Sequence, residues 1–533
     1  MHGAHGIGGR WGRLGGSGRF AFPAAWAALA AVLGFGIGQA PEAVLGLGLA
    51  LAGLGLLLRI PETGLGLALL TGPFAPLENE RWGPPVNSAQ IFLALSLLAG
   101  LWRGLARREG RIPGWGWAWA YGLFLGYAFL TLAWAPSWEE GVPEGIKWAQ
   151  VGLVVILVLG APRPVQRFLL GMALLSGAVQ AGIGLWQAAL RGAGPAHFRL
   201  PGLPLYRAYG TFQQPNPFGG MMGLIAPVAL GLGIGMLGSA KGSPSMGRWG
   251  AAVGALAVGG LAGAGLLASG SRGAWLGAAG AGAVLILLLP RRGRTGLAAG
   301  AALGLALGLL GSSGWIPPVL QARLAGVREE LWVADVRGVE VNEANFAVIE
   351  RLAHWQAAVE MIRAHPWFGV GLGNYAVVYP RYALIRWPHP LGHAHNIYLN
   401  MAAETGLAGL SLYLLFWAVV GVRTWRAWQG SAGWRRGLAA GLMAAWAHLH
   451  IHNLFDNLYV ANLPLFLALY GAWVEILINE RESPSPPDPG PSQGREDPPS
   501  LHDRGGTPWK EGFCSAPSSG DGIAPIAKRR SGS

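Results

Sequence analysis

The residues best suited to chemistry lie in one short string, HAHNIYLNMAAETGLAG, where a polar stretch meets an apolar run. In it His395 is followed by Asn396, nine residues, Gly406, two residues and Gly409. An imidazole near neutral pH can take a proton from a hydroxyl within hydrogen-bond reach. The two glycines allow another segment to pack closely on the following helix. Glu404 lies in the apolar run, where we expect it to hydrogen-bond within the protein and support the site.

Other histidines raise the question of a metal site. His393 precedes His395 by two residues, and the string HLHIHN places His448 and His452 four residues apart on one face of a predicted helix. A zinc enzyme needs three well-placed ligands and a base. The single cysteine, Cys514, excludes a multi-cysteine metal site and an internal disulfide framework. Because no established ligand spacing is present, we predict half-buried, hydrogen-bonded histidines, no metal and no cofactor.

Three arginines are candidates for binding an anionic substrate. Arg207 precedes YGTFQQPNPFGG, Arg272 lies in SGSRGAW, and Arg191 ends an apolar stretch. A guanidinium keeps its charge and forks onto phosphate oxygens. The alternative is a long side chain that reaches from a helix end to the membrane surface. The charge distribution described below favours phosphate binding for Arg272 and Arg207 and leaves both interpretations open for Arg191.

The elements that must position these side chains are membrane helices. Hydrophobic residues make up 52% of the 533 residues and charged residues only 12%. Apolar stretches long enough to cross a bilayer recur along the chain. They predict an all-α polytopic membrane protein with about 12–14 transmembrane helices. The fourteen candidate spans are 21–40, 43–58, 62–77, 88–102, 114–134, 148–161, 168–189, 218–238, 250–269, 273–289, 296–315, 397–421, 437–455 and 460–478.

Lysine and arginine concentrate in alternate loops, and these loops are expected to be cytoplasmic. This accounts for the net charge of +13 without a nucleic-acid partner. We predict a cytoplasmic segment at 1–20, transmembrane helices in 21–315, and a long extracytoplasmic loop at 316–396. Further transmembrane helices follow in 397–478, and a proline- and serine-rich, disordered cytoplasmic tail in 479–533. The three candidate arginines then lie outside, against the general distribution of charge.

The long loop is predicted to contain an amphipathic helix that lies on the outer surface of the bundle and ends at Pro366. One apolar face is formed by residues spaced three or four apart, Val348, Leu352, Trp355, Val359 and Ile362. The string GVGLGN follows this helix as a glycine turn. A dinucleotide fingerprint would follow a strand, so nucleotide binding is not predicted.

Several stretches resemble the O-antigen ligase-related membrane family, which includes O-antigen ligases, O-antigen polymerases and protein O-oligosaccharyltransferases. RLAHWQAAVEMIRAHPWFGVGLGNYAVVYP and HAHNIYLNMAAETGLAGL resemble its signature region. The ligase pattern is His, then Asn, Ser or Gln, nine residues, Gly, two residues, and Gly, Thr or Tyr. It is matched by His395, Asn396, Gly406 and Gly409. RAYGTFQQPNPFGG and SGSRGAWLG resemble two further stretches, so the likeness covers roughly residues 200–420.

The resemblance implies a metal-independent, inverting glycosyltransferase at the outer face of the inner membrane, serving polysaccharide or lipopolysaccharide biosynthesis in the cell envelope. The donor would be a glycan on undecaprenyl diphosphate, and the acceptor a glycan, a lipid or a protein. By position, His395 is expected to be catalytic, and Arg272 and Arg207 to bind the diphosphate. Arg191 and Asn396 are further candidates for substrate binding.

Two alternatives remain open at this point. A polymerase of the same family differs from a ligase only in its acceptor, and the histidine pattern favours the ligase. A polysaccharide transporter or flippase would also carry ionisable groups in a helix bundle, with membrane lipids around it. Transporters commonly have inverted repeats and broken helices at mid-membrane. Here the polar groups gather at the outer boundary, which favours an enzyme.

Overall fold

The computed structural model describes residues 55, 60–82, 87–107, 114–199, 205–238, 246–290, 293–312, 335–342 and 345–482. All of them belong to one unit of the chain, Met1–Ser483. The predicted spans 21–40 and, apart from Gly55, 43–58 lie outside the described residues, as does the predicted tail from residue 483 onward.

The described part of the chain consists of helices and connections, with a single isolated bridge between Arg199 and Tyr206 and no strand. The helices are α3 (Glu62–Thr71), α4 (Ala75–Trp82), α5 (Ser88–Arg107), α6 (Ala118–Leu130), α7 (Trp138–Gly160), α8 (Arg163–Ala189), α9 (Pro215–Gly238), α10 (Met246–Ala268), α11 (Arg272–Leu288), α12 (Gly293–Ser312), α15 (Phe346–Ala364), α16 (Tyr375–Val378), α17 (Ile397–Gly430), α18 (Gly433–His452) and α19 (Leu463–Glu482). Short 3-10 turns lie at Gly72–Phe74, Thr131–Trp134, Ala196–Phe198 and Tyr379–Arg381.

Six of the described helices are long and apolar enough to cross a membrane: α7, α8, α9, α10, α17 and α19. Shorter apolar helices cover Ser88–Gly104, Ala118–Trp134 and Arg272–Leu288. The predicted all-α polytopic membrane fold is therefore confirmed.

The predicted span 62–77 is wrong as one continuous helix. α3 ends at Thr71, and a 3-10 turn at Gly72–Phe74 separates it from α4. Pro73 cannot donate a backbone hydrogen bond, which explains the break. α7 begins ten residues earlier than the predicted span 148–161, because Ser137 caps it by accepting a hydrogen bond from the amide of Glu140.

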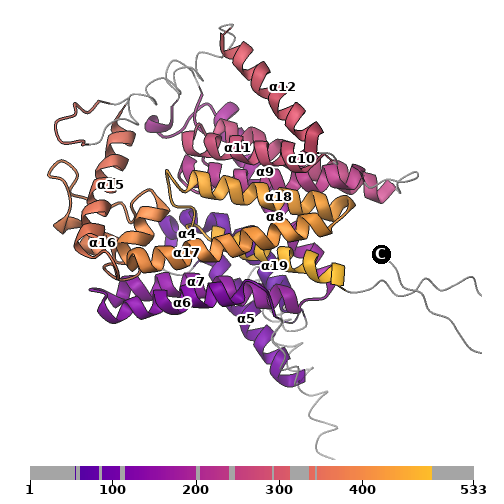
Figure 1. The fold of residues 1–533 in the computed structure, drawn as a ribbon, viewed down its shortest axis with the longest axis horizontal. Coiled ribbons are helices and arrows are strands. Elements are labelled where there is room, and N and C mark those ends of the chain that lie inside the picture. Colours follow the sequence, from indigo (N-terminus) through magenta and orange to yellow (C-terminus); the bar gives the residue numbers. More distant parts are fainter. Residues whose placement is uncertain are drawn as a thin grey trace, which may run out of the picture. The chain divides into compact units, whose positions relative to one another are not determined.

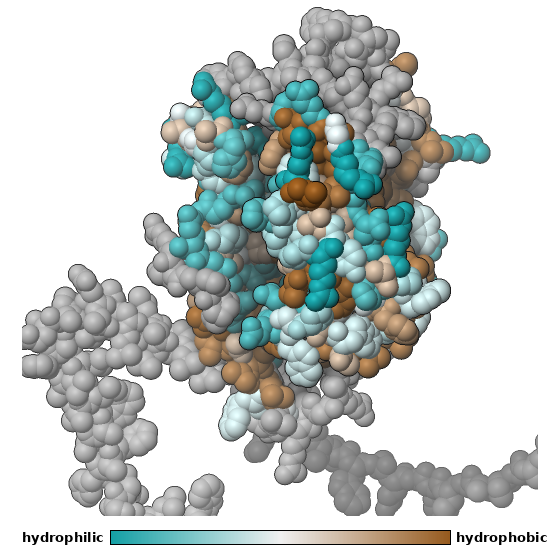
Figure 2. Space-filling view, turned by 90° about the vertical axis from the view of Figure 1, so that its left-hand side faces the viewer, coloured by the Kyte–Doolittle hydropathy of each residue, from teal (hydrophilic) through white to brown (hydrophobic). Residues whose placement is uncertain are grey.

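The bundle brings together helices from distant parts of the chain (Figure 1). α18 packs on α9 and α11, α10 packs on α9 and α8, and α19 packs on α7. α17 contacts α6, α18 and α19, and α15 lies against α17. α11 and α17 begin, and α18 ends, at the same end of the bundle, which we call the site end. Figure 2 looks onto the face that carries α15 and α16, where many hydrophilic side chains are gathered.

α15 confirms the predicted helix in the long loop, but the predicted buried face is wrong. The five apolar residues expected to face the protein are only half-buried. The buried residues are Ile349, Ala353, His354, Ala357, Ala358 and Met361. Two of these alanines cluster with Ala394 and Ala403, at and near the start of α17. Small side chains let α15 approach α17 closely, so the larger apolar residues flank the contact instead of forming it.

Candidate active site

His395 lies just before α17, and the two residues that follow it fix where this helix begins. Asn396 is the N-cap of α17, and its side-chain oxygen accepts hydrogen bonds from the amides of Tyr398 and Leu399 at 3.0 and 3.1 Å. An asparagine cap satisfies amides that the first helical turn leaves free. The amide of Ile397 donates to the carbonyl of Asn453 at 3.0 Å, which fixes the start of α17 to the end of α18.

The backbone of His395 has a φ of 51°, a left-handed conformation that is uncommon for a residue other than glycine. Its amide donates to Nδ1 of His393 at 3.0 Å, and its carbonyl accepts from the indole N–H of Trp355 on α15 at 3.4 Å. Burial, followed by the charge of His395, lowers the pKa of His393 to about 3. His393 is therefore neutral at physiological pH and accepts the hydrogen bond that helps hold the conformation of its neighbour.

Asp456, in the connection between α18 and α19, faces the imidazole of His395. Its Oδ1 lies 3.5 Å from Nδ1 of His395, and the two side chains are 8% and 19% exposed. Among the described residues, this nitrogen is buried without a hydrogen-bond partner. The amide of Asn457 donates to the same carboxylate oxygen at 2.9 Å. Burial alone would raise the pKa of Asp456, but the contact with His395 and the charge of Arg351 hold it below its usual range.

A histidine that faces a carboxylate through one ring nitrogen presents the other nitrogen to a substrate. The carboxylate favours the tautomer with the proton on its own side and stabilises the imidazolium that forms after proton uptake. Asp456 was not among the candidate residues predicted from the sequence. The signal was present, because an aspartate within the apolar string HNLFDNLYV at the end of a predicted span is a candidate functional residue by default.

Arg351 on α15 was also not predicted from the sequence, and it lies near this pair. Its charge lowers the pKa of Asp456. Its Nη1 donates to the carbonyl of Ala347 at 3.3 Å, whereas its Nε is buried without a partner among the described residues. Trp355, also on α15, lies near Asp456. Its ring centroid is 6.4 Å from that of Phe455, the residue before Asp456. An unpaired buried guanidinium N–H is costly unless it meets an acceptor, such as a substrate oxygen.

Two of the predicted arginines lie at the beginning of α11. Arg272 is its first residue and is half-buried. Arg207 donates from Nε to the carbonyl of Ser269 at 2.8 Å and from Nη2 to Oδ1 of Asn216 at 3.2 Å. Its guanidinium is therefore fixed to the segment that carries Arg272. A side chain at Gly273 would lie 3.4 Å from Cβ of Phe455, so this segment also borders the connection that bears Asp456.

Arg191 takes a more peripheral position. It is exposed, donates to the hydroxyl of Tyr209 at 2.8 Å, and lies over the ring of Trp186. These contacts place it at the site end of the bundle, and none of them reaches His395. Its predicted role in substrate binding remains a prediction.

Glu404 and Gly406 hold the glycine turn, GVGLGN, and the residues just before it against α17, whereas Gly409 lies against Thr405 of the same helix and Tyr127 of α6. The carboxylate of Glu404 accepts hydrogen bonds from the amides of Gly373 and Tyr375 at 2.9 and 3.1 Å. α17 departs from helical geometry at Gly406, where φ is 68° and ψ is −179°. The amide of Leu407 consequently donates to the carbonyl of Pro366, at 2.8 Å.

The backbone geometry of the turn requires glycine at three positions. Gly369, Gly371 and Gly373 all have positive φ, and a side chain at Gly369 would lie 2.4 Å from the carbonyl of Glu404. Asn374 closes the turn by exchanging hydrogen bonds with the backbone of Ser137 before α7. The string therefore joins α15, α17 and α7, as a backbone element that only glycine allows.

One group of side chains in the described residues has ligand atoms close enough to hold a metal ion. His393, His395 and Asp456 each offer an atom within 4.8 Å of the others. Nδ1 of His393 is already used as the acceptor for the His395 amide, which leaves only its Nε2 for a metal. The residues thus provide a carboxylate and two imidazoles, of which one imidazole is committed to holding the backbone.

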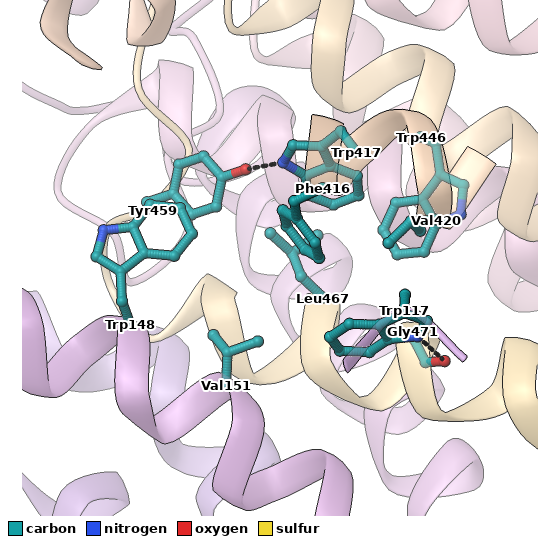
Figure 3. Close-up of a pocket in the computed structure, with 10 residues that line it drawn as sticks. All are labelled: Trp117, Trp148, Val151, Phe416, Trp417, Val420, Trp446, Tyr459, Leu467 and Gly471. Atoms are coloured by element: carbon teal, nitrogen blue, oxygen red, sulfur yellow. Dashed lines mark hydrogen bonds between the residues drawn. The ribbon is translucent and has the colours of Figure 1, made fainter. Parts of the chain in front are cut away.

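An aromatic cavity inside the bundle is too small for a substrate. It has a volume of ≈ 20 Å³ and is lined mainly by the rings shown in Figure 3, including Trp148, Trp417 and Tyr459. The indole of Trp417 donates to the hydroxyl of Tyr459 at 3.0 Å. A space of this size holds a water molecule at most. This cavity is therefore not a candidate substrate site.

Comparison with known proteins supports the resemblance seen in the sequence. Residues 257–414 match the family model described as O-antigen ligase. The matched segment runs from α10 to the first half of α17, and so contains Arg272, Arg351 and His395, while Asp456 lies beyond it. No curated protein is similar enough to count as a match. The chain is thus a multi-pass membrane protein in which residues 257–414 are similar to the O-antigen ligase family, and this similarity supports an enzyme of the ligase or polymerase type.

Proposed function

We propose that the enzyme transfers a glycan from undecaprenyl diphosphate to an acceptor hydroxyl, with His395 as the general base. The pair of His395 and Asp456 carries this proposal, because it presents one imidazole nitrogen at the site end while a buried carboxylate faces the other. His395 takes the proton of the acceptor hydroxyl, and the hydroxyl oxygen attacks the anomeric carbon. The bond from that carbon to the diphosphate breaks, and its electron pair leaves with the lipid diphosphate. Attack opposite the leaving group inverts the anomeric configuration.

The leaving diphosphate gains negative charge, and the arginines around the pair are suited to stabilise it. Arg272 begins α11, Arg207 is fixed beside it by its hydrogen bond to Ser269, and the unpaired Nε of Arg351 supplies a further donor from α15. Guanidinium groups can hold phosphate oxygens in a forked geometry without a metal. We therefore propose a metal-independent reaction, in which a chelator leaves the rate unchanged. Asn396, with its oxygen committed to the helix cap, retains its amide N–H groups for a substrate.

The site is proposed to face the extracytoplasmic side of the inner membrane. This rests on the distribution of lysine and arginine between alternate loops. Ile385 is 99% exposed in the long loop and provides a reporter position. In a Cys514→Ser background, Ile385→Cys should react with a membrane-impermeant thiol reagent in cells whose inner membrane is intact. Labelling only after that membrane is broken would reverse the orientation.

We propose a ligase, on the basis of the histidine pattern, and the acceptor is what distinguishes it from a polymerase. The full-length protein in detergent would be incubated with an undecaprenyl diphosphate glycan and, separately, with a lipid-linked core sugar, a second lipid-linked glycan and a hydroxyl-bearing peptide. The product is read by mass. His395→Gln should abolish transfer while donor binding persists, because glutamine can donate and accept but cannot hold a proton as imidazolium. An active His395→Gln protein would exclude His395 as the general base. Transfer only to the second lipid-linked glycan would identify a polymerase.

A further inference from the structure

The outer loop contains a second, larger pocket that the proposed reaction does not use. It has a volume of ≈ 550 Å³, within the range of small-molecule sites. Its walls come from the segment before α15, the first residue of α15 and the segment after α16. The lining residues are Gly338, Val339, Glu340, Val341, Phe346, Arg386 and Trp387.

The chemistry of this pocket combines aromatic faces with charged groups. The ring centroids of Phe346 and Trp387 lie 5.2 Å apart with their planes at 57°, and Phe346 is 47% exposed. Arg386 and Glu340 add one charge of each sign beside the rings. A sugar ring offers C–H groups on its faces, which pack on aromatic rings, and hydroxyls on its edge, which bond charged side chains. A lipid chain would instead need a continuous apolar wall.

The pocket walls are connected to the reacting histidine. The carbonyl of Trp387 accepts a hydrogen bond from the hydroxyl of Tyr379 at 2.8 Å. Tyr379 stacks on His354 with ring centroids 4.5 Å apart, and the His354 ring lies 6.0 Å from that of His395. Along α15, Phe346 precedes Trp355, which contacts His395, by nine residues or about 13 Å. A glycan of a few sugar units can therefore occupy the pocket while its end is at His395.

We propose that this pocket is a carbohydrate subsite that holds sugar units remote from the reacting bond. The inference rests on the proposed glycosyl transfer and extends it, because it assigns a place to the body of the glycan. It also implies a dependence on glycan length, since only a chain long enough to span from His395 to Phe346 gains the contact. Binding energy from remote sugars can hold the reacting end in position.

The first test measures binding and needs no transfer. The probe is the oligosaccharide released by mild acid from the lipid-linked donor, observed by saturation-transfer NMR with full-length protein in detergent. Phe346→Ala and Arg386→Ala should each weaken binding about tenfold, and Phe346→Tyr should restore it. Ile385→Ala is the matched control, because Ile385 is exposed beside Arg386 and does not line the pocket. Equal binding by Phe346→Ala and wild type would overturn the subsite.

The second test identifies which substrate supplies the sugars. With a fixed acceptor, the donor carries either one sugar or a full oligosaccharide; with a fixed donor, the acceptor glycan is varied in the same way. Phe346→Ala should raise KM about tenfold for the long form of one substrate and leave kcat and the KM of its short form unchanged. A rise of equal size for short and long forms contradicts the proposal. Absence of transfer by wild-type protein refutes the proposed function alone, since the NMR test decides the subsite independently.

Discussion

Replacing Gly406 by alanine should destabilise the protein more than the same replacement at any other glycine of α17. Gly406 has φ 68° and ψ −179°, a region that is essentially restricted to glycine, and occupying it costs an alanine about 1–3 kcal/mol. The new Cβ would also lie 2.2 Å from the carbonyl oxygen of Trp367, and relieving such a clash costs about 1–3 kcal/mol more. We therefore expect a loss of about 2–6 kcal/mol in the free energy of unfolding.

The same helix supplies graded controls. A methyl group at Gly421 would have no neighbouring atom within 4 Å, so Gly421→Ala should be neutral or stabilise the helix by up to about 1 kcal/mol. At Gly409 the methyl would lie 2.0 Å from Oγ1 and 2.3 Å from Cβ of Thr405. Rotation can move the hydroxyl but not Cβ, so the helix must also shift slightly, and Gly409→Ala should cost about 1–3 kcal/mol without the additional cost of a positive φ.

The assay is unfolding of each variant in mixed detergent, followed by helical circular dichroism, with glycan transfer measured on the folded fraction. The predicted order of stability is Gly421→Ala, wild type, Gly409→Ala, then Gly406→Ala. Transfer should be lost in Gly406→Ala even where the protein is folded, because the segment at Trp367 leads directly into the glycine turn that Glu404 holds. A Gly406→Ala protein as stable and active as Gly421→Ala would refute the reasoning.

Three further predictions concern the site. Asp456→Asn should lower kcat about 10²-fold while donor binding persists, because the histidine loses the charge that stabilises its protonated form; unchanged kcat would remove Asp456 from the mechanism. Arg351→Lys should weaken donor binding about tenfold, whereas Arg363→Lys, an exposed change on the same helix, should have no effect in the same titration. Burial, followed by the charge of His395, lowers the pKa of His354 from 6.5 to about 4, so the unfolded chain binds a proton that the folded protein excludes. Stability should therefore fall as the pH drops from about 6.5 to about 4, and His354→Phe should reduce this slope in unfolding experiments.

The sequence predicted the parts of this structure that depend on local patterns. Apolar stretches of sufficient length indicated the helices, and the asparagine before Ile397 marks the beginning of α17. Glu404 was expected to hydrogen-bond within the protein, and it does so with two loop amides. In each case the pattern within a few residues determines the outcome, because a buried carboxylate or a helix start has few ways to satisfy its hydrogen bonds.

The features that the sequence did not reveal depend on partners far along the chain. The break at Gly406 is visible only once Pro366 lies beside α17 and accepts the amide of Leu407. Arg351 lies on an amphipathic helix, where a charged residue is usually solvated, and only the fold buries its Nε and brings its charge near Asp456. The buried face of α15 was misjudged for a related reason, since small residues such as Ala357 gain burial from a close approach that no single-helix pattern encodes.

The left-handed backbone of His395 follows from the same convergence of distant elements. A histidine in this conformation is less stable by itself, and such strain persists only where the surroundings impose it. Here three elements act on one residue: His393 accepts its amide, Trp355 on α15 donates to its carbonyl, and Asp456 before α19 faces its ring. Because all three residues lie outside the candidate membrane-spanning helices, we expect that a glycan bound near α15 would affect the orientation of the base without any rearrangement of the bundle.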